Sequence, residues 1–262
     1  MPDIDLQNKP LIEAFVEVRW QLAQDDTERL VDPLYKFLLG RLYDRLLEQF
    51  PEHEKLPTAT VPDEMVPHVV QHRFRPGPNE WPVVQVGPGI FSVNQTQAYT
   101  WSEFTNLAQW AVGKLHEAYP KPDELRIQRL LLRYIDAISL EPKKENIFEF
   151  LRNKLKIEIA FPDGLFQGTE IDRNPANFNL QTSFECANPK GRVVVHFSTA
   201  QLGQGEEKSP ALSWQTTVMS AGNDVPPMPG EFEGWLESAH EITHNWFFKL
   251  IEGELLEEFR GE

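Results

Sequence analysis

LRIQRLLLRYIDAISL, residues 125–140, is the stretch that decides the fold of this chain of 262 residues. Leu130, Leu132 and Tyr134 recur at every second position, which predicts a long β-strand with one face in the core. A second alternating strand, Leu11–Trp20, lies near the start of the chain. The two strands predict two halves that begin in the same way.

The remaining elements follow from apolar residues at period two for strands and at three- or four-residue spacing for helices. The sequence Thr100-Trp101-Ser102-Glu103 is a capping box and predicts where one helix begins. The expected strands are 69–75, 82–86, 90–94, 178–186, 193–199 and 212–219, and the expected helices are 27–50, 100–119, 145–156 and 231–259.

The order of these elements predicts an α+β protein with an internal duplication. Residues 1–122 read as strand, helix, three strands and helix, and residues 123–262 repeat that order. We expect antiparallel sheets covered by helices, with both repeats in one compact unit. The sequence leaves open whether two sheets lie side by side or join into one sheet around a shared cleft.

Composition limits the class of protein and of partner. The apolar content of 40% supports a sizeable core, and the single cysteine, Cys186, predicts a cytoplasmic protein without disulfides. The formal charge of −15 argues against nucleic acid or an anionic membrane as the partner and is compatible with a basic protein. We recognise no signal peptide in Met1–Lys9 and no membrane-spanning stretch, which predicts a soluble protein.

His240-Glu241-Ile242-Thr243-His244 matches the H-E-x-x-H pattern of zinc hydrolases. In that pattern two imidazoles bind zinc and the glutamate acts as general base on bound water. The third ligand expected after the second histidine is missing, and the helical period turns Glu241 away from the apolar stripe. We therefore expect no metal and no catalytic residue, and we interpret His240 and His244 as residues at the edge of a core-facing helix. Zinc hydrolysis through His240, His244 and Glu241 is the alternative.

Arg129 and Arg133 lie two pleats apart on one strand face. One interpretation is that they bind an anionic small molecule in a cleft between the halves. The other is that they pair with carboxylates of this acid-rich chain. Gly87-Pro88-Gly89 is interpreted as a turn, and Cys186 as a buried apolar residue.

Several segments resemble a sporadically distributed family of prokaryotic proteins of about this length. The matching segments are Lys9–Ala14 with Val16–Arg19, Tyr99–Phe104, Arg129–Ile138, and the last helix with Ala239, His240 and Phe247 or Phe248. At Asp136 the family more often has Asn. The resemblance implies a shared fold and a prokaryotic origin, and it implies no site residues because the family has no established activity.

These observations favour a protein that acts by binding and not by catalysis. We predict an accessory or antitoxin-like component whose acidic surface meets another protein, with no cofactor. The alternatives are the zinc-dependent hydrolase of residues 240–244 and an anion binder using Arg129 and Arg133. The sequence does not determine whether the chain forms homo-oligomers.

Overall fold

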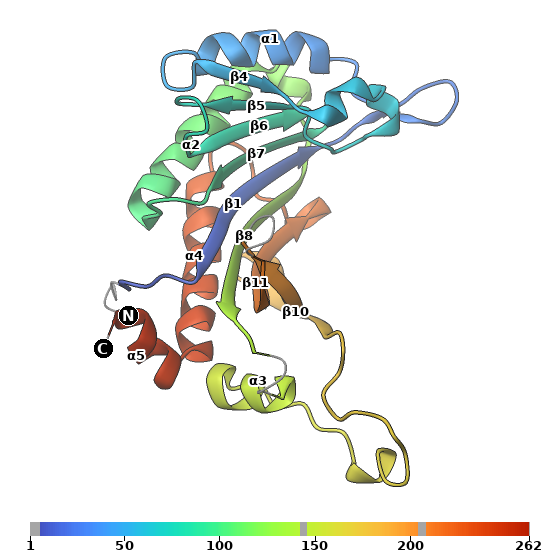
Figure 1. Cartoon of the computed structure of the whole chain (residues 1–262). Coiled ribbons are helices and arrows are strands. Elements are labelled where there is room, and N and C mark those ends of the chain that lie inside the picture. The colour runs from blue at the N-terminus through green and yellow to red at the C-terminus, as the bar shows by residue number, and fades with distance from the viewer. Residues whose placement is uncertain (1–5, 142–145, 204–207, 262) are drawn as a thin grey trace.

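Nine antiparallel strands form one sheet in the order β4-β5-β6-β7-β1-β8-β11-β10-β9, as Figure 1 shows. The structure is a computed structural model that describes residues 6–141, 146–203 and 208–261. The strands of this sheet are β1 (Leu11–Trp20), β4 (Glu52–Lys55), β5 (His72–Arg75), β6 (Val83–Gly87), β7 (Ile90–Gln95), β8 (Ile127–Ser139), β9 (Asn179–Ala187), β10 (Lys190–Leu202) and β11 (Ser209–Ala221). A separate pair consists of β2 (Ala23–Gln24) and β3 (Leu30–Val31).

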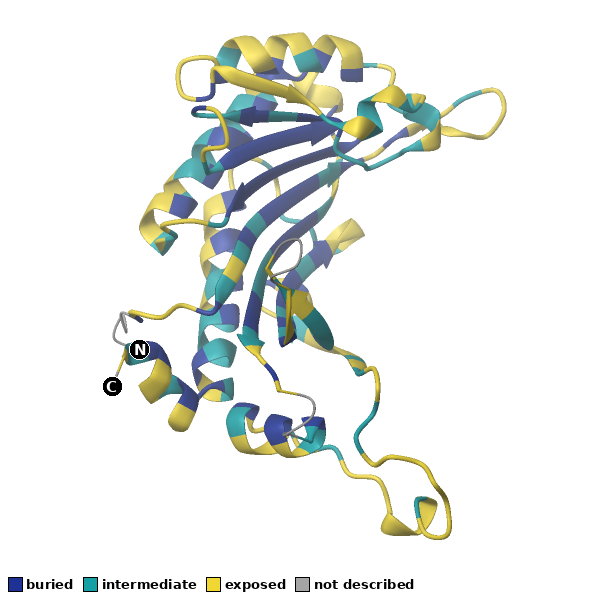
Figure 2. Ribbon diagram, in the orientation of Figure 1, coloured by how far each residue is buried: buried dark blue, intermediate teal, exposed yellow. Residues whose placement is uncertain are grey.

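The helices supply the layer that buries one face of this sheet. They are α1 (Tyr35–Leu46), α2 (Trp101–Ala118), α3 (Ile147–Leu155), α4 (Phe232–Leu250) and α5 (Glu254–Arg260). Figure 2 shows the buried residues concentrated along the central strands and on the helix faces that meet them. The α+β class is therefore confirmed, and strands from both predicted halves belong to one nine-stranded sheet.

The two strands that open the predicted halves lie side by side at the centre of the sheet. Val16 pairs with Leu132 and Val18 pairs with Leu130 across β1 and β8. These four side chains are fully buried and belong to the larger core cluster, together with residues of α1, α2 and α4. Burial of such side chains contributes about 1.5–3 kcal/mol each, so this central pair anchors the fold.

A second core cluster lies at the other end of the sheet. Here residues of α3 and α5 pack with Val195 and Phe197 of β10 and with Leu212 and Trp214 of β11. The hairpin predicted between 178–186 and 193–199 is confirmed, with Phe184 opposite Val193. Residues 157–161, which follow α3, are irregular.

Two helix predictions differ from the structure at their ends. The helix expected from residue 27 begins at Tyr35, because Asp25 accepts hydrogen bonds from Thr27 and Arg29 and holds a turn between β2 and β3. The helix expected over 231–259 is two helices, since the positive φ of 102° at Gly253 separates α4 from α5. Glycine adopts this conformation without steric strain.

The start expected for the third helix, Glu145, lies outside the described residues, and α3 begins at Ile147 after the cap Asn146. Three strands, β2, β3 and β4, were not expected. β4 consists of exposed polar residues, and its pairing with β5 accounts for its extended form. The strand expected from Val69 begins at His72.

None of the described helices is both long enough and apolar enough to cross a membrane.

Candidate functional site

A cleft of about 780 Å³ opens between the first turn of α2, the end of β8 and the middle of α4. Pockets of this size accommodate a small ligand or a side chain of a partner. The residues that define its chemistry are Tyr99, Trp101, Tyr134, Asp136, His240 and His244. They come from three elements that the tertiary fold brings together.

The capping box places the aromatic wall of this cleft. Thr100 accepts a hydrogen bond from the backbone amide of Glu103 at 3.3 Å and donates one to the Glu103 carboxylate at 2.9 Å. The predicted helix start is thus confirmed, although Glu103 bonds the threonine hydroxyl and not a backbone amide. Because the cap fixes the first turn of α2, the Trp101 ring is held beside α4.

His240 is the residue at which the three elements meet. Its ring stacks on Trp101 with centroids 3.7 Å apart and planes within 6°. Its Nδ1 lies 2.9 Å from the Tyr134 hydroxyl, which lies 2.7 Å from the Tyr99 hydroxyl. Burial, with a smaller contribution from His244, lowers the pKa of His240 to about 3, so the ring is neutral at pH 7.

Asp136 is the most unusual group in the cleft. It follows Leu130, Leu132 and Tyr134 on the inward face of β8 and is only 3% exposed. Burial raises the pKa of its carboxyl to about 8. No described residue donates a hydrogen bond to this carboxyl or forms an ion pair with it, and the carboxyl lines the cleft. Buried carboxyl groups ordinarily have such partners, so Asp136 is a candidate binding residue.

From the sequence, Asp136 was noted only as the position at which the similar prokaryotic family more often has Asn. The signal that identifies it is its position at even spacing from Leu130 and Leu132, which places an acidic side chain on the core face of a strand. An acidic residue on that face needs either a partner or a function.

The two histidines and the glutamate of the H-E-x-x-H segment also line the cleft. The rings of His240 and His244 have centroids 5.4 Å apart, and both residues are partly buried at the edge of the apolar face of α4. Glu241 is exposed at the rim. Within the described ranges, no three His, Cys, Asp or Glu side chains converge in a way that fits a metal ion. Because no third donor meets the two histidines there, we derive no hydrolytic step from this segment.

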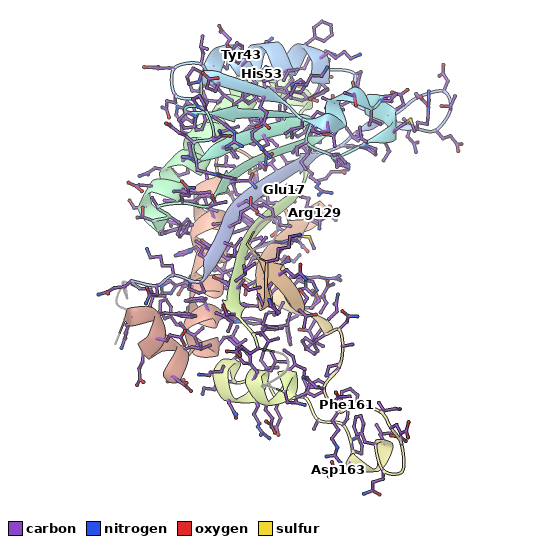
Figure 3. The ribbon with its side chains drawn as sticks, viewed as in Figure 1. Glu17, Tyr43, His53, Arg129, Phe161 and Asp163 are labelled. Atoms are coloured by element: carbon purple, nitrogen blue, oxygen red, sulfur yellow. The ribbon has the colours of Figure 1, made fainter. Side chains whose placement is uncertain are left out.

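Arg129 and Arg133 lie on the opposite face of β8, away from this cleft; Figure 3 labels Arg129 and the nearby Glu17. Arg129 donates to the Met219 sulfur at 2.9 Å, and Arg133 donates to the Thr217 hydroxyl at 2.8 Å. Burial lowers the pKa of both guanidinium groups, which stay charged at pH 7. The fold therefore separates the arginines from the histidines.

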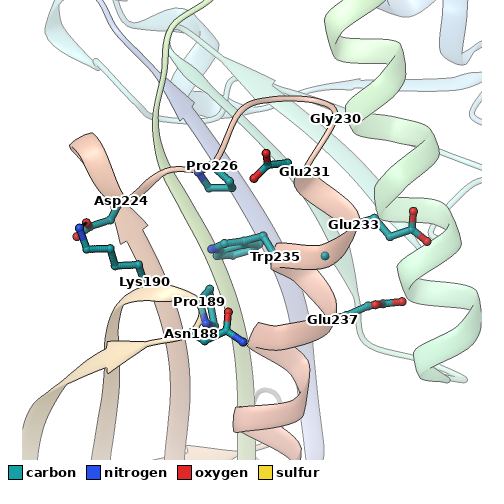
Figure 4. Close-up of a pocket in the computed structure, with 11 residues that line it drawn as sticks. Asn188, Pro189, Lys190, Asp224, Pro226, Gly230, Glu231, Glu233, Trp235 and Glu237 are labelled. Atoms are coloured by element: carbon teal, nitrogen blue, oxygen red, sulfur yellow. Dashed lines mark ion pairs between the residues drawn. The ribbon is translucent and has the colours of Figure 1, made fainter.

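A second cavity of about 600 Å³ adjoins α4 nearer its N-terminus (Figure 4). It lies between the turn that joins β9 to β10 and the first turns of the helix. Lys190, the first residue of β10, forms an ion pair with Asp224 at 2.9 Å, whereas Glu233 and Glu237 line the same cavity. Glu237 lines both cavities, so they are adjacent along α4.

No protein-family model matches this chain, and no curated protein matches it.

Proposed function

We propose that this protein acts by binding, and that its cleft holds a positively charged nitrogen of a partner against Asp136. The observation that carries the proposal is a buried carboxyl that faces a cleft without a hydrogen-bond donor from the described residues. A bound ammonium or guanidinium group would supply the missing donors and favour the ionised carboxylate.

The surroundings of Asp136 support a cation and not an anion. Glu237 and Glu241 add two negative charges to the lining, against one positive charge from Lys9, whose ammonium donates to the Tyr99 carbonyl oxygen at 3.3 Å. Trp101 and two tyrosines provide aromatic surface, which attracts cations. Since His240 is neutral at pH 7, it does not repel a cation.

This proposal agrees with an accessory or antitoxin-like protein that recognises a basic partner. The net charge of −15 favours the encounter with such a partner. Cytoplasmic location, absence of nucleic-acid and membrane partners, and relation to the sporadically distributed prokaryotic family stay predictions from the sequence.

Three probes of one size and different charge test the proposal: butylammonium, butyramide and butyrate. We expect thermal unfolding at pH 8 to shift upward with butylammonium alone, and the shift to disappear in Asp136→Asn. Asp123→Asn, which removes an exposed carboxylate near the start of β8, is the matched control and should retain the shift. Stabilisation by butyrate, or an unchanged butylammonium shift in Asp136→Asn, would contradict the proposal.

An anionic ligand at Arg129 and Arg133 is a second candidate. It is favoured because neither guanidinium forms an ion pair with a carboxylate anywhere in the described residues, contrary to the pairing that the sequence suggested as an alternative. Stabilisation by inorganic phosphate that disappears in Arg133→Gln would support it, and an equal effect in both proteins would exclude it.

A zinc-dependent hydrolase using His240, His244 and Glu241 stays an alternative proposal. It is favoured by the shared position of these side chains on one cleft, and it requires a third ligand to move into place. Metal analysis of the purified protein decides this question.

We also propose that the two halves arose by duplication. The order β5-β6-β7-β1 mirrors β9-β10-β11-β8 about the central pair, and β1 and β8 are each followed by a helix, three of these strands and a long helix. An experimental structure in which the halves do not superpose about a two-fold axis across β1 and β8 would contradict this proposal.

A further inference from the structure

We infer that the partner is a polypeptide whose basic segment lies along α4, with one cationic side chain in the cleft on Asp136 and a second beside Glu233 in the adjoining cavity. This inference rests on the proposed function, because Asp136 provides the first anchor. It adds the class of partner and the spacing of its charges.

The first observation is a row of acidic side chains on α4. Glu233, Glu237 and Glu241 follow one another at four-residue intervals, which places them along one side of a helix. Figure 4 shows the first two pointing to the same side of α4. No ion pair with another described residue neutralises any of the three. Three glutamates so close together repel one another unless a cation lies between them.

The second observation is the arrangement of the cavities. Glu233 lines the smaller cavity, Glu241 lines the larger cleft, and Glu237 lines both. The acidic row therefore runs from one cavity to the other. Asp136, buried and without a partner in the described structure, lies in the cleft at one end of this row. An acidic row alone would indicate only a hydrated surface, and it is Asp136 that indicates a ligand.

The spacing favours a polypeptide over a small molecule. Glu233 and Glu241 are eight residues apart, which corresponds to about 12 Å along a helix. An extended chain covers about 3.3 Å per residue, so side chains three or four residues apart span that distance. The matching segment carries two lysines or arginines separated by two or three other residues. Its backbone would pass over Glu237.

In the adjoining cavity, the carboxylates that have no ion pair with another described residue are those of α4 and of its N-cap residue. Lys190 is paired with Asp224 across the cavity and is therefore neutralised. Trp235 closes the floor, where its Nε1 donates to the Ser220 hydroxyl at 2.8 Å. Figure 4 shows the side chains of Glu233 and Glu237 on the opposite side of α4 from Trp235, so a second cation beside Glu233 meets carboxylates and not the indole ring.

Capped peptides test the inference by calorimetry. One peptide has a single lysine among alanines, one has two lysines separated by two alanines, and one has two adjacent lysines. We expect the spaced pair to bind about fivefold more tightly than the single lysine, in line with one added exposed ion pair. We expect adjacent lysines to gain less.

Variants distinguish the proposed function, which depends on Asp136, from the inference of a second basic contact, which depends on Glu233. Glu233→Gln should remove the advantage of the spaced pair and leave binding of the single lysine unchanged. Glu257→Gln, an exposed glutamate of α5, is the charge-matched control and should retain the advantage. If Asp136→Asn leaves all binding unchanged, the proposed function itself fails. If Asp136→Asn weakens binding but the spaced pair has no advantage, only this inference fails.

Other occupants would give different results. Equal affinity for spermidine and the spaced peptide would overturn the assignment to a polypeptide. A dimer in sedimentation velocity that the spaced peptide does not dissociate would show that a second copy covers α4, and would overturn it as well.

Discussion

The hydroxyl of Tyr134 lies 2.9 Å from Nδ1 of His240 and so joins the centre of the sheet to the long C-terminal helix. Tyr134 is on β8, and the His240 ring is stacked on Trp101 at the start of α2. These two contacts of His240 therefore hold together the three elements that line the cleft. The buried, uncharged state of His240 and the buried carboxyl of Asp136 make the stability of this site depend on pH in opposite directions.

Asp136→Asn should change the pH dependence of unfolding. The folded pKa of about 8 exceeds the ordinary value of 3.8, so between these values the folded state holds a proton that the unfolded state has released. The wild type loses stability as pH rises through this window, on the order of 1 kcal/mol per pH unit, and Asp136→Asn removes that loss.

Urea unfolding at pH 5, 6.5 and 8 measures this effect. The free energy of unfolding of Asp136→Asn relative to the wild type should increase from the lowest pH to the highest. A difference that stays constant would show that the carboxyl has no raised pKa.

His240→Gln should remove a loss of stability that the wild type shows as pH falls, whereas Asp136→Asn removes a loss that it shows as pH rises. The folded pKa of about 3 lies below the ordinary value of 6.5, so stability that is present above pH 6.5 is lost as pH falls toward 3. The wild type loses on the order of 1 kcal/mol per pH unit from this source, and the neutral glutamine does not.

Titration of the His240 ring by NMR checks this prediction directly. A ring that titrates near 6.5 would contradict it. The same unfolding series should show the wild type losing its stability advantage over His240→Gln as pH is lowered from 6.5 to 4.

Two glycines should respond oppositely to alanine. A Cβ at Gly87 would lie 1.9 Å from the carbonyl oxygen of Val69, so Gly87→Ala should lower the free energy of unfolding by about 3 kcal/mol. Gly113 is within α2 and has no heavy atom within 4 Å of the added Cβ, so Gly113→Ala should raise it by about 0.5–1 kcal/mol. Thermal unfolding of both variants measures the contrast, and equal effects would refute the close approach at Gly87.

Zinc content tests the alternative site at residues 240–244. We expect the protein purified with added zinc and then dialysed to retain much less than one equivalent, because Tyr134 already bonds Nδ1 of His240 and the two histidines meet no third donor among the described residues. Elemental analysis measures this. Retention of one equivalent that is lost in His244→Ala would establish the zinc site and reverse this expectation.

Most strands of the sheet could be predicted from the sequence because they show a clear alternation of apolar residues. Leu130, Leu132 and Tyr134 show period two, and the capping box defines the start of α2 within one residue. β4 was missed because its four residues are exposed and polar, and only pairing with β5 makes them a strand. Pairing partners far apart in the chain leave no local pattern.

Only some residues of the candidate site could be predicted from the sequence. His240, His244 and Glu241 were named from a motif, and the structure adds the aromatic stack on Trp101 and the bond to Tyr134. Asp136 was not selected as a site residue. The sequence around a carboxyl on a strand is the same whether the folded protein gives that carboxyl a hydrogen-bond partner or leaves it facing a cleft. Arg129 and Arg133 were selected correctly as a pair on one face, but their distance from the histidines depends on which face the helices cover.

The sequence by itself determined most of the long helices and strands, the α+β class and the acidic charge, because periodicity, capping and composition act over a few neighbouring residues. The tertiary structure alone decided that β1 and β8 pair at the centre of one nine-stranded sheet and that the buried Asp136 and the neutral His240 line one cleft. The physical reason is that burial and pKa depend on which distant side chains exclude water from a group, and that is fixed only when the chain has packed.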